Sequence, residues 1–149
     1  LRWAISLHEI GVSVAHTEFH KHGAYILGHA DMPGFSKRDQ ARLALLVLGQ
    51  RGKLQKLASM PAGDPNWRLV FCLRLAVLLH RARDAHPFSE LSVLEDPVGF
   101  QLDLPVGWQE TNPMMAAALA EEALLWRRIG IKLRIRSTVP GQIAVPLVL

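Results

Sequence analysis

The sequence predicts a mainly α-helical chain that ends in a small ββαβ module. Through residues 1–86, apolar residues recur at the spacing of three and four that places them on one face of a helix. After Pro87 they alternate with polar residues, which is typical of strands. The composition, 50% hydrophobic and 20% charged, is that of a globular protein. We therefore expect a helical domain over 1–86, the ββαβ module over 87–136 and an unstructured or loosely packed tail over 137–149.

The first half of the helical part contains three predicted helices. Apolar spacing indicates helices over residues 1–10 and 19–30. A third helix is expected to begin after Ser36, because Asp39 follows three residues later in an arrangement that resembles a capping box. This helix is expected to end near Gly49.

The second half of the helical part is a connector followed by the most apolar helix. Residues 52–66 are polar and carry two prolines, so we expect a connector there. A helix is predicted over 67–83, and between residues 69 and 79 its only charge is Arg74. We expect this helix to be the most buried element, with Cys72 filling space in its core.

The pattern after Pro87 predicts a hairpin, a helix and one more strand. Residues 91–93 and 100–104 alternate in polarity around a turn, which indicates two antiparallel strands. Asn112 is expected to cap a helix over 113–130 that has proline at its first position and glycine at its end. The strand over 131–136 should have one apolar and one basic face.

Charge and cysteine content limit the classes of function. Residues 1–86 carry a net charge of +6 and residues 87–149 a net charge of −2. Such a basic excess suggests a polyanionic partner, although surface solubility also explains it. No stretch has the ~20 apolar residues of a spanning helix, so no membrane partner is expected. A single cysteine excludes a disulfide framework and favours the cytoplasm. The start at Leu1, without initiator methionine or signal peptide, is interpreted as that of a fragment.

Several motifs together resemble one known family. They are LHEIG at 7–11, His16, HKHGAYIL at 20–27, DMPGFS at 31–36, LRLAVLLHRAR at 73–83, LPVGW at 104–108, Asn112-Pro113 and the strand at 130–135. In this combination the chain resembles the C-terminal region of the exopolyphosphatase / guanosine pentaphosphate phosphohydrolase family. The resemblance covers residues 1–136 and implies an HD-like helical domain followed by the α/β module.

The first motifs also resemble the metal site of HD phosphohydrolases, with two ligands changed. Glu9 stands where the dyad aspartate would be, and Val77 stands where the closing aspartate would be. The remaining candidates for a degenerate metal site are His8, Glu9, His16 and His20. Without the aspartates such a site cannot readily offset the loss of metal hydration, so we expect no metal here.

The resemblance implies that this chain lacks catalytic residues. In the family, a terminal phosphate is removed from polyphosphate or guanosine pentaphosphate with Mg²⁺ by two N-terminal actin-like domains. No GxxxxGK[ST] or GxGxxG phosphate loop occurs in this chain. We therefore expect no cofactor in this fragment of a hydrolase. The family's C-terminal half implies three partners: polyphosphate or another phosphate-rich anion, the protein's own catalytic domains and a second copy in a homodimer.

Six side chains are candidates for contacts with phosphate. Ammonium, guanidinium and imidazolium groups form charge-assisted hydrogen bonds with phosphate oxygens. The candidates are Lys21, His22, Arg38, Arg42, Arg51 and Lys53. An ordinary solvated surface is the competing interpretation. If the contacts exist, binding should depend steeply on salt, as it does for nucleic acids.

Other interpretations remain open. The chain could be an active HD phosphohydrolase whose metal is held by His8, Glu9 and His16 or His20. Third in rank is a nucleic-acid-binding module, favoured only by the pI of 9.7, since no recognition helix or aromatic platform is evident. Arg74 should form a salt bridge, with Glu9 or Asp31 as candidate partners. The sequence does not distinguish polyphosphate from guanosine pentaphosphate.

Overall fold

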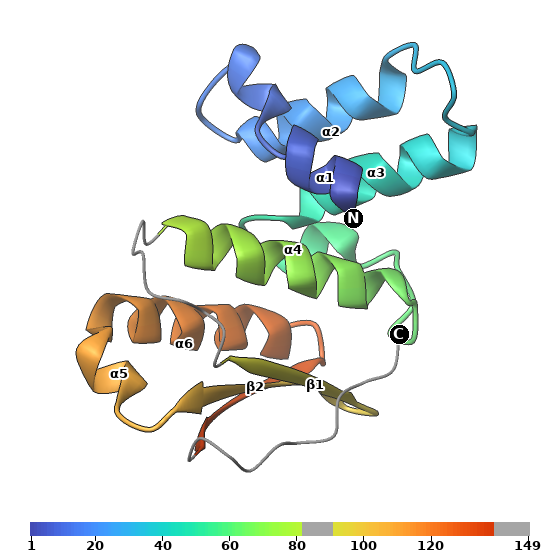
Figure 1. The fold of residues 1–149 in the computed structure, drawn as a ribbon. Coiled ribbons are helices and arrows are strands. Elements are labelled where there is room, and N and C mark those ends of the chain that lie inside the picture. Colours follow the sequence, from blue (N-terminus) through green and yellow to red (C-terminus); the bar gives the residue numbers. More distant parts are fainter. Residues whose placement is uncertain (82–90, 139–149) are drawn as a thin grey trace. The chain divides into compact units, whose positions relative to one another are not determined.

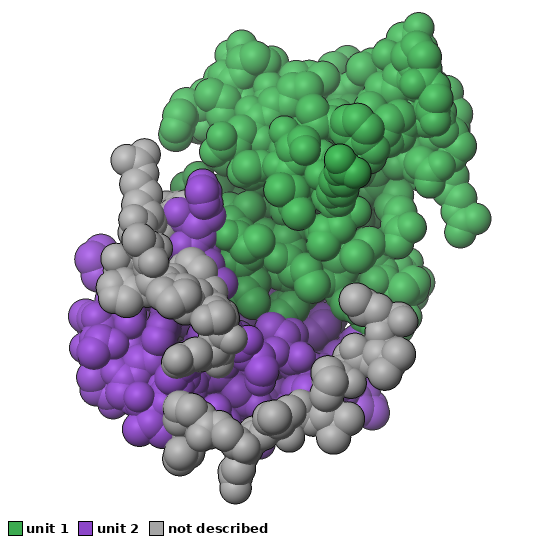
Figure 2. Space-filling view, in the orientation of Figure 1, with its two compact units in different colours: residues 1–78 green, residues 79–149 purple. Residues whose placement is uncertain are grey.

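The protein forms two compact units, residues 1–78 and residues 79–149 (Figures 1 and 2). The computed structural model describes residues 1–81 and 91–138. The predicted mainly α-helical class with a small sheet module is confirmed. The division between the units falls within a helix, whereas the predicted boundary between residues 86 and 87 lies outside the described residues.

Unit 1 is built from helices only. Its elements are α1 (Arg2–Leu7), η1 (Ile10–Ser13), α2 (Phe19–His29), α3 (Lys37–Gly49), η2 (Leu54–Leu57) and most of α4 (Asn66–Arg81). Helices α2 and α3 pack against each other, and α1 lies on α3 (Figure 1). The buried hydrophobic residues of the unit are Ala4, Phe19, Leu27, Leu43, Leu46, Val47, Leu54, Leu57, Met60, Trp67, Val70, Phe71 and Leu73.

The predicted first helix is interrupted. Instead of one helix over 1–10, α1 ends at Leu7 and the 3₁₀ helix η1 follows it. Gly11 in η1 lies against the backbone of α2, where a Cβ would meet Phe19 O at 1.9 Å. This close approach requires a residue without a side chain at position 11.

Helix α3 begins as predicted. Ser36 is its N-cap, and Ser36 Oγ accepts a hydrogen bond from the backbone N–H of Asp39 at 3.1 Å. The same hydroxyl donates to Asp39 Oδ2 at 2.5 Å, so the acidic side chain closes the cap from its other side. One of the orphan donors of the first turn is thereby satisfied.

The predicted polar connector at 52–66 contains structure that contributes to the core. Leu54 and Leu57 of η2 are 0% and 3% exposed, and Met60 is also buried. A Cβ on Gly49 would meet Leu57 Cδ1 at 2.9 Å, so η2 packs directly on the end of α3. The missing side chain at Gly49 leaves room for this contact.

Helix α4 has one buried face rather than being buried all round. Trp67, Val70, Phe71 and Leu73 are buried. Cys72, however, is exposed, so its predicted place in the core is wrong. The helical turn places residue 72 on the opposite side from the buried residues 70 and 74, and apolar composition alone does not reveal that orientation.

Unit 2 contains a three-stranded sheet in the order β1-β2-β3 (Figure 1). Strands β1 (Ser92–Asp96) and β2 (Gly99–Pro105) form the predicted antiparallel hairpin, in which Val93 pairs with Leu102. Strand β3 (Lys132–Thr138) pairs with β2 in parallel, with Leu102 opposite Ile135. The strand continues through Ser137 and Thr138, so the first two residues of the predicted tail are structured.

Two helices connect β2 to β3. A short α5 (Trp108–Thr111), which the sequence did not predict, precedes α6 (Pro113–Arg127). Pro113 occupies the first turn of α6 as predicted, but the side chain of Asn112 does not cap the helix. Asn112 Nδ2 donates instead to Trp108 O at 2.9 Å, because α5 brings that carbonyl within reach.

The sheet uses its apolar side to contact α6. Phe100 and Trp126 of α6 form an edge-to-face pair with centroids 5.4 Å apart. Trp126 is 0% exposed, and its Nε1 donates to Oε1 of the buried Glu122 at 2.7 Å. Within residues 1–81 and 91–138, no helix is both long and apolar enough to cross a bilayer.

Candidate anion-binding site

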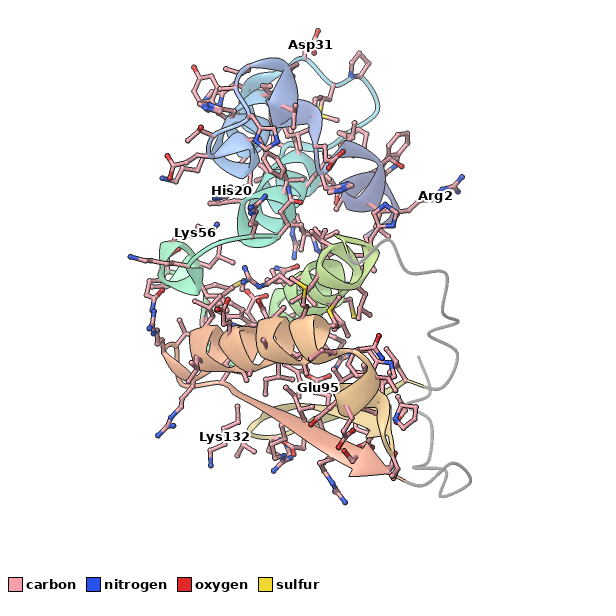
Figure 3. All side chains as sticks on the ribbon, turned by 90° about the vertical axis from the view of Figure 1, so that its left-hand side faces the viewer. Arg2, His20, Asp31, Lys56, Glu95 and Lys132 are labelled. Carbon is pink, nitrogen blue, oxygen red and sulfur yellow. The ribbon has the colours of Figure 1, made fainter. Side chains whose placement is uncertain are left out.

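Two nitrogen-bearing side chains from separate segments of unit 1 meet at Gly52. His20 lies in α2 and Lys56 in η2, and Figure 3 shows the two side chains near each other. A Cβ on Gly52 would be 3.7 Å from both His20 Nε2 and Lys56 Nζ. Because both lie 3.7 Å from the same point, these two nitrogens are less than about 7.5 Å apart. Gly52 has a φ of +73°, which a glycine adopts without strain.

His20 is buried and not fully hydrogen-bonded. Its side chain is 8% exposed, and its Nδ1 has no hydrogen-bond partner among the described residues. Burial lowers the pKa of His20 to about 4, and the charges of Lys56, Lys21 and Arg51 act in the same direction while Glu18 opposes them. His20 is consequently neutral at pH 7.

Lys56 is half-buried in positive surroundings. Its Nζ donates to the backbone carbonyl of Arg51. Burial lowers the pKa of Lys56 to about 8, with further lowering by Arg74 and Lys21 and only Glu18 acting against it. Its ammonium group is therefore still mostly protonated at pH 7 and is surrounded by like charge.

Lys21 and Arg51 complete the cluster on its exposed side. Lys21 Nζ lies 2.5 Å from Glu18 Oε1, and this contact lowers the pKa of Glu18. The guanidinium of Arg51 lies 5.6 Å from the centroid of the Phe19 ring, a cation–π arrangement. We call His20, Lys21, Arg51 and Lys56 the Lys56 cluster. Among the described residues, Glu18 is the one carboxylate that acts on both His20 and Lys56.

Arg74 supports the cluster from α4. Its side chain is 4% exposed, and Nη1 donates to Gly49 O, at the end of α3, at 2.8 Å. A cation at this end of a helix interacts favourably with the helix dipole. Asp31 is exposed, and Glu9 Oε1 lies 3.9 Å from His8 Nε2. The contact with the end of α3 is the one described for Arg74, and the salt bridge with Glu9 or Asp31 stays a prediction.

The six candidate phosphate contacts do not all gather. Lys21 and Arg51 belong to the Lys56 cluster, while His22, half-buried on α2, and Lys53, the exposed residue before η2, flank it in the sequence. Arg38 and Arg42 are exposed on α3, and Arg42 Nε donates to Asn66 Oδ1 at 2.7 Å. Neither Arg38 nor Arg42 is among the charges that act on His20 or Lys56.

The four candidates for a degenerate metal site are not arranged as ligands. His8 Nδ1 contacts Ile5 O at 2.7 Å, while Glu9 has 69% of its side chain exposed. His16 is exposed beside Phe19, and His20 is directed to Gly52. Across residues 1–81 and 91–138, no three His, Cys, Asp or Glu side chains are placed to hold a metal ion.

Sequence reasoning missed Lys56. It lies in the predicted polar connector, and the 3₁₀ helix η2 that carries it has four residues, which is too short to produce a helical pattern in the sequence. A usable signal was present in the apolar pair Leu54 and Leu57, which share a side of one helical turn and direct the intervening residues outward. A turn that buries two leucines beside Gly52 can position a lysine.

The basic residues of β3 form no comparable cluster. As predicted, Leu133 is buried while Lys132, Arg134 and Arg136 are exposed. Arg134 forms an ion pair with Asp96, and Arg136 Nη1 donates to Gln101 Oε1 at 3.4 Å. Two of these three basic side chains therefore interact with polar groups of β1 and β2.

Comparison with known proteins gives consistent matches. The family model described as Ppx/GppA phosphatase, domain III, matches residues 1–123. The chain is similar to guanosine-5'-triphosphate,3'-diphosphate pyrophosphatases of Pseudoalteromonas translucida (34% identity over 132 residues), Photobacterium profundum (36% over 128) and Vibrio cholerae (37% over 139). These matches cover 85%, 83% and 91% of this chain but 26%, 25% and 28% of the relatives. The chain spans about a quarter of their length.

The fold and the Lys56 cluster define a mainly α-helical protein with a cationic site and a small mixed sheet. With the matches above, the chain belongs to the Ppx/GppA phosphatase family, in the region described as domain III. The family predicted from the combined sequence motifs is confirmed.

Proposed function

We propose that this chain is a non-catalytic, polyanion-binding domain of a phosphatase, and that the Lys56 cluster binds inorganic polyphosphate. The observation that carries the proposal is the grouping of Lys21, Arg51 and Lys56 around His20, where Glu18 is the one carboxylate among the described residues that acts on both His20 and Lys56. The half-buried ammonium of Lys56 loses hydration and is repelled by the neighbouring positive charges. A bound polyanion supplies the missing negative charge and accepts several charge-assisted hydrogen bonds.

The phosphate-rich character of the ligand is supported by the relatives. Their names describe enzymes that act on guanosine-5'-triphosphate,3'-diphosphate, a molecule with two phosphate chains. A linear polyphosphate presents the same repeated anionic group. In this proposal, hydrolysis and its Mg²⁺ belong to parts of the enzyme outside this chain.

Titration calorimetry of the 149-residue chain with inorganic polyphosphate tests the proposal. We expect log Kd to rise linearly with log salt between about 50 and 200 mM, because bound cations are displaced. Lys21→Ala/Arg51→Ala should weaken binding at least about tenfold and reduce the salt slope by about two. The matched control Lys132→Ala/Arg136→Ala removes the same charge from β3 and should leave the affinity within about twofold.

Three results contradict the proposal. Equal losses of affinity in the cluster variant and the β3 control would mean that binding depends on net charge alone. Tighter binding of single-stranded nucleic acid at matched charge would favour a nucleic-acid module. Release of phosphate together with a stoichiometric metal ion would favour an active HD-type hydrolase. The affinity of Arg38→Ala/Arg42→Ala, compared with that of the same control, decides whether the polyanion also contacts α3.

The proposal includes a homodimer, association with the enzyme's own catalytic domains and a cytoplasmic location. Trp3, Ile5 and Val14 of unit 1 are 58%, 50% and 60% exposed, which supports a protein contact near α1 and η1. Analytical ultracentrifugation of the chain and of its Trp3→Ser/Ile5→Ser variant tests self-association. A monomer at all concentrations would contradict the dimer.

A further inference from the structure

Lys56 combines three properties that exposed lysines do not share. Its amine is half-buried, it is held by the carbonyl of Arg51, and His20 Nε2 lies beside it across Gly52. The hydrogen bond to a backbone carbonyl fixes the position of Nζ. Lys21 and Arg51, exposed at the same place, can attract an anionic reagent.

We propose that Lys56 is an N-acylation site whose acyl donor is an acyl phosphate. Such a donor carries a phosphate group, which Lys21 and Arg51 can bind, next to an electrophilic carbonyl carbon. The cluster therefore attracts the phosphate end of the reagent and brings its carbonyl carbon to Nζ. A positioned nucleophile and electrophile react faster than the same groups in free solution.

The chemical step is a transfer of the acyl group from oxygen to nitrogen. The lone pair of the neutral Lys56 amine forms the bond to the carbonyl carbon. The bond between that carbon and the phosphate oxygen then breaks, and inorganic phosphate leaves with the electron pair. The nitrogen loses its extra proton to solvent, and the product is an uncharged amide. No oxidant or metal is needed.

The surroundings of Lys56 increase the fraction of reactive amine. With a pKa of about 8, about a tenth of the Lys56 amine is neutral at pH 7, against less than about 0.1% for an ordinary lysine. The groups that set this value are the buried surroundings, Arg74 from α4, and Lys21 with Glu18 from the start of α2. His20 is neutral at this pH and so adds no positive charge.

Acylation of Lys56 would weaken polyanion binding. This consequence rests on the proposed function. The amide has no charge, so the Lys56 cluster loses one of its three cations. Removal of one phosphate-neutralising charge weakens binding and lowers the salt slope by about one. Acylation of Lys56 would thus reduce the affinity of the domain for polyanions.

The site is tested by treating the whole 149-residue chain with acetyl phosphate and measuring each lysine by peptide mass spectrometry. At pH 7, Lys56 should be acetylated at least about tenfold faster than the exposed Lys37, Lys53 and Lys132, because more of its amine is neutral. Its rate should level off above about pH 8, whereas typical exposed lysines continue to gain with pH. Acetic anhydride, which lacks the phosphate, should show a smaller preference. A rate at Lys56 no higher than at the three exposed lysines would overturn the proposal.

The regulatory consequence has a separate readout. Inorganic tripolyphosphate should slow acetylation at Lys56 but not at Lys132, and the acetylated chain should bind tripolyphosphate several-fold more weakly. The same treatment should not change the affinity of Lys56→Arg, which has no amine to acylate at this position. Selective acetylation without protection or loss of affinity would keep the modification site but overturn its consequence, and with it polyanion binding at the Lys56 cluster.

Discussion

Gly11 lies so close to Phe19 that a Cβ at position 11 would be 1.9 Å from the Phe19 carbonyl oxygen. The next contact, at 2.4 Å, is the backbone nitrogen of Gly23. Both atoms belong to the main chain of α2 and cannot move aside alone. This approach fixes η1 on α2 and so places the first turn of α2, which carries His20 and Lys21.

Replacement of Gly11 should therefore damage unit 1. We expect Gly11→Ala to lower the free energy of unfolding by at least about 3 kcal/mol, because real Cβ atoms do not approach backbone atoms this closely. The control is Gly28→Ala on α2, whose Cβ would meet Ala44 Cβ at 3.9 Å. It should gain about 0.5–1 kcal/mol from higher helix propensity. Urea unfolding measures both, and equal effects of the two variants would contradict the close contact.

The stability of unit 1 should depend on pH through His20. Its pKa falls from 6.5 to about 4 on folding, so the unfolded chain binds more protons between these values. Stability therefore decreases as the pH falls from 7 towards 4, by at most about 3 kcal/mol. Urea unfolding between pH 5 and 7, where few carboxylates titrate, isolates this effect. His20→Gln should flatten the dependence of the unfolding free energy on pH, whereas the control His29→Gln, at an exposed position, should not. The same pH slope in both variants would contradict the prediction.

Lys56 should decrease stability while it supports binding. Its pKa of about 8 in the folded chain lies below the ordinary lysine value of 10.5, so at pH 7 the charged amine opposes folding. Lys56→Met should raise the unfolding free energy by about 1–2 kcal/mol after the loss of its bond to Arg51 O. The gain should shrink as the pH rises towards 10, where Lys56 itself becomes neutral. The exposed Lys53→Met serves as control, and a loss of stability in Lys56→Met would contradict this account.

Arg74 should be required for both stability and the pKa of Lys56. Arg74→Ala removes a buried side chain and its charge-assisted bond to Gly49 O, at a cost of about 3 kcal/mol. It should also raise the pKa of Lys56, because the charge of Arg74 is the largest cause of lowering after burial. Thermal unfolding measures the first effect and NMR titration of Lys56 the second. Arg2→Ala, at an exposed position, is the control. An unchanged pKa of Lys56 in a folded Arg74→Ala chain would contradict an effect of Arg74 on Lys56.

In unit 2, Trp126 should stabilise the buried Glu122. Trp126→Phe preserves most of the packing on Phe100 but removes the Nε1 donor to Glu122 Oε1. We expect a loss of about 2 kcal/mol, as for a bond to a charged group. The same substitution with Glu122→Met should recover part of this loss, which a double-mutant cycle in urea measures. Strict additivity of the two substitutions would contradict a direct interaction.

Local signals predicted the elements of this fold well. The Ser36 cap, the hairpin turn before Gly99 and the proline at the start of α6 each act within a few residues of sequence. Such signals are readable because the atoms that interact are close along the chain. The predictions that are wrong concern residues whose neighbours in space are distant along the sequence. Gly11 is an example, because it packs against Phe19 and Gly23 of α2.

The candidate site was predicted only in part, for the same reason. Charge alone indicates Lys21 and Arg51, whereas the motif resemblance assigns His20 to a degenerate metal site and no local pattern indicates Lys56. Thirty-six residues separate His20 from Lys56, and their meeting depends on how η2 packs against the end of α3. Charge composition gives the number of cations but not which of them share a neighbour.

The sequence by itself determined the order of helices and strands, the basic character of the first part and the family, because these follow from periodicity, charge and motifs along the chain. Only the tertiary structure decided that Cys72 faces outward, that Arg74 contacts the end of α3 and that Lys56 lies beside His20. Burial and the field of neighbouring charges depend on all packed elements at once, so they appear only when those elements are assembled.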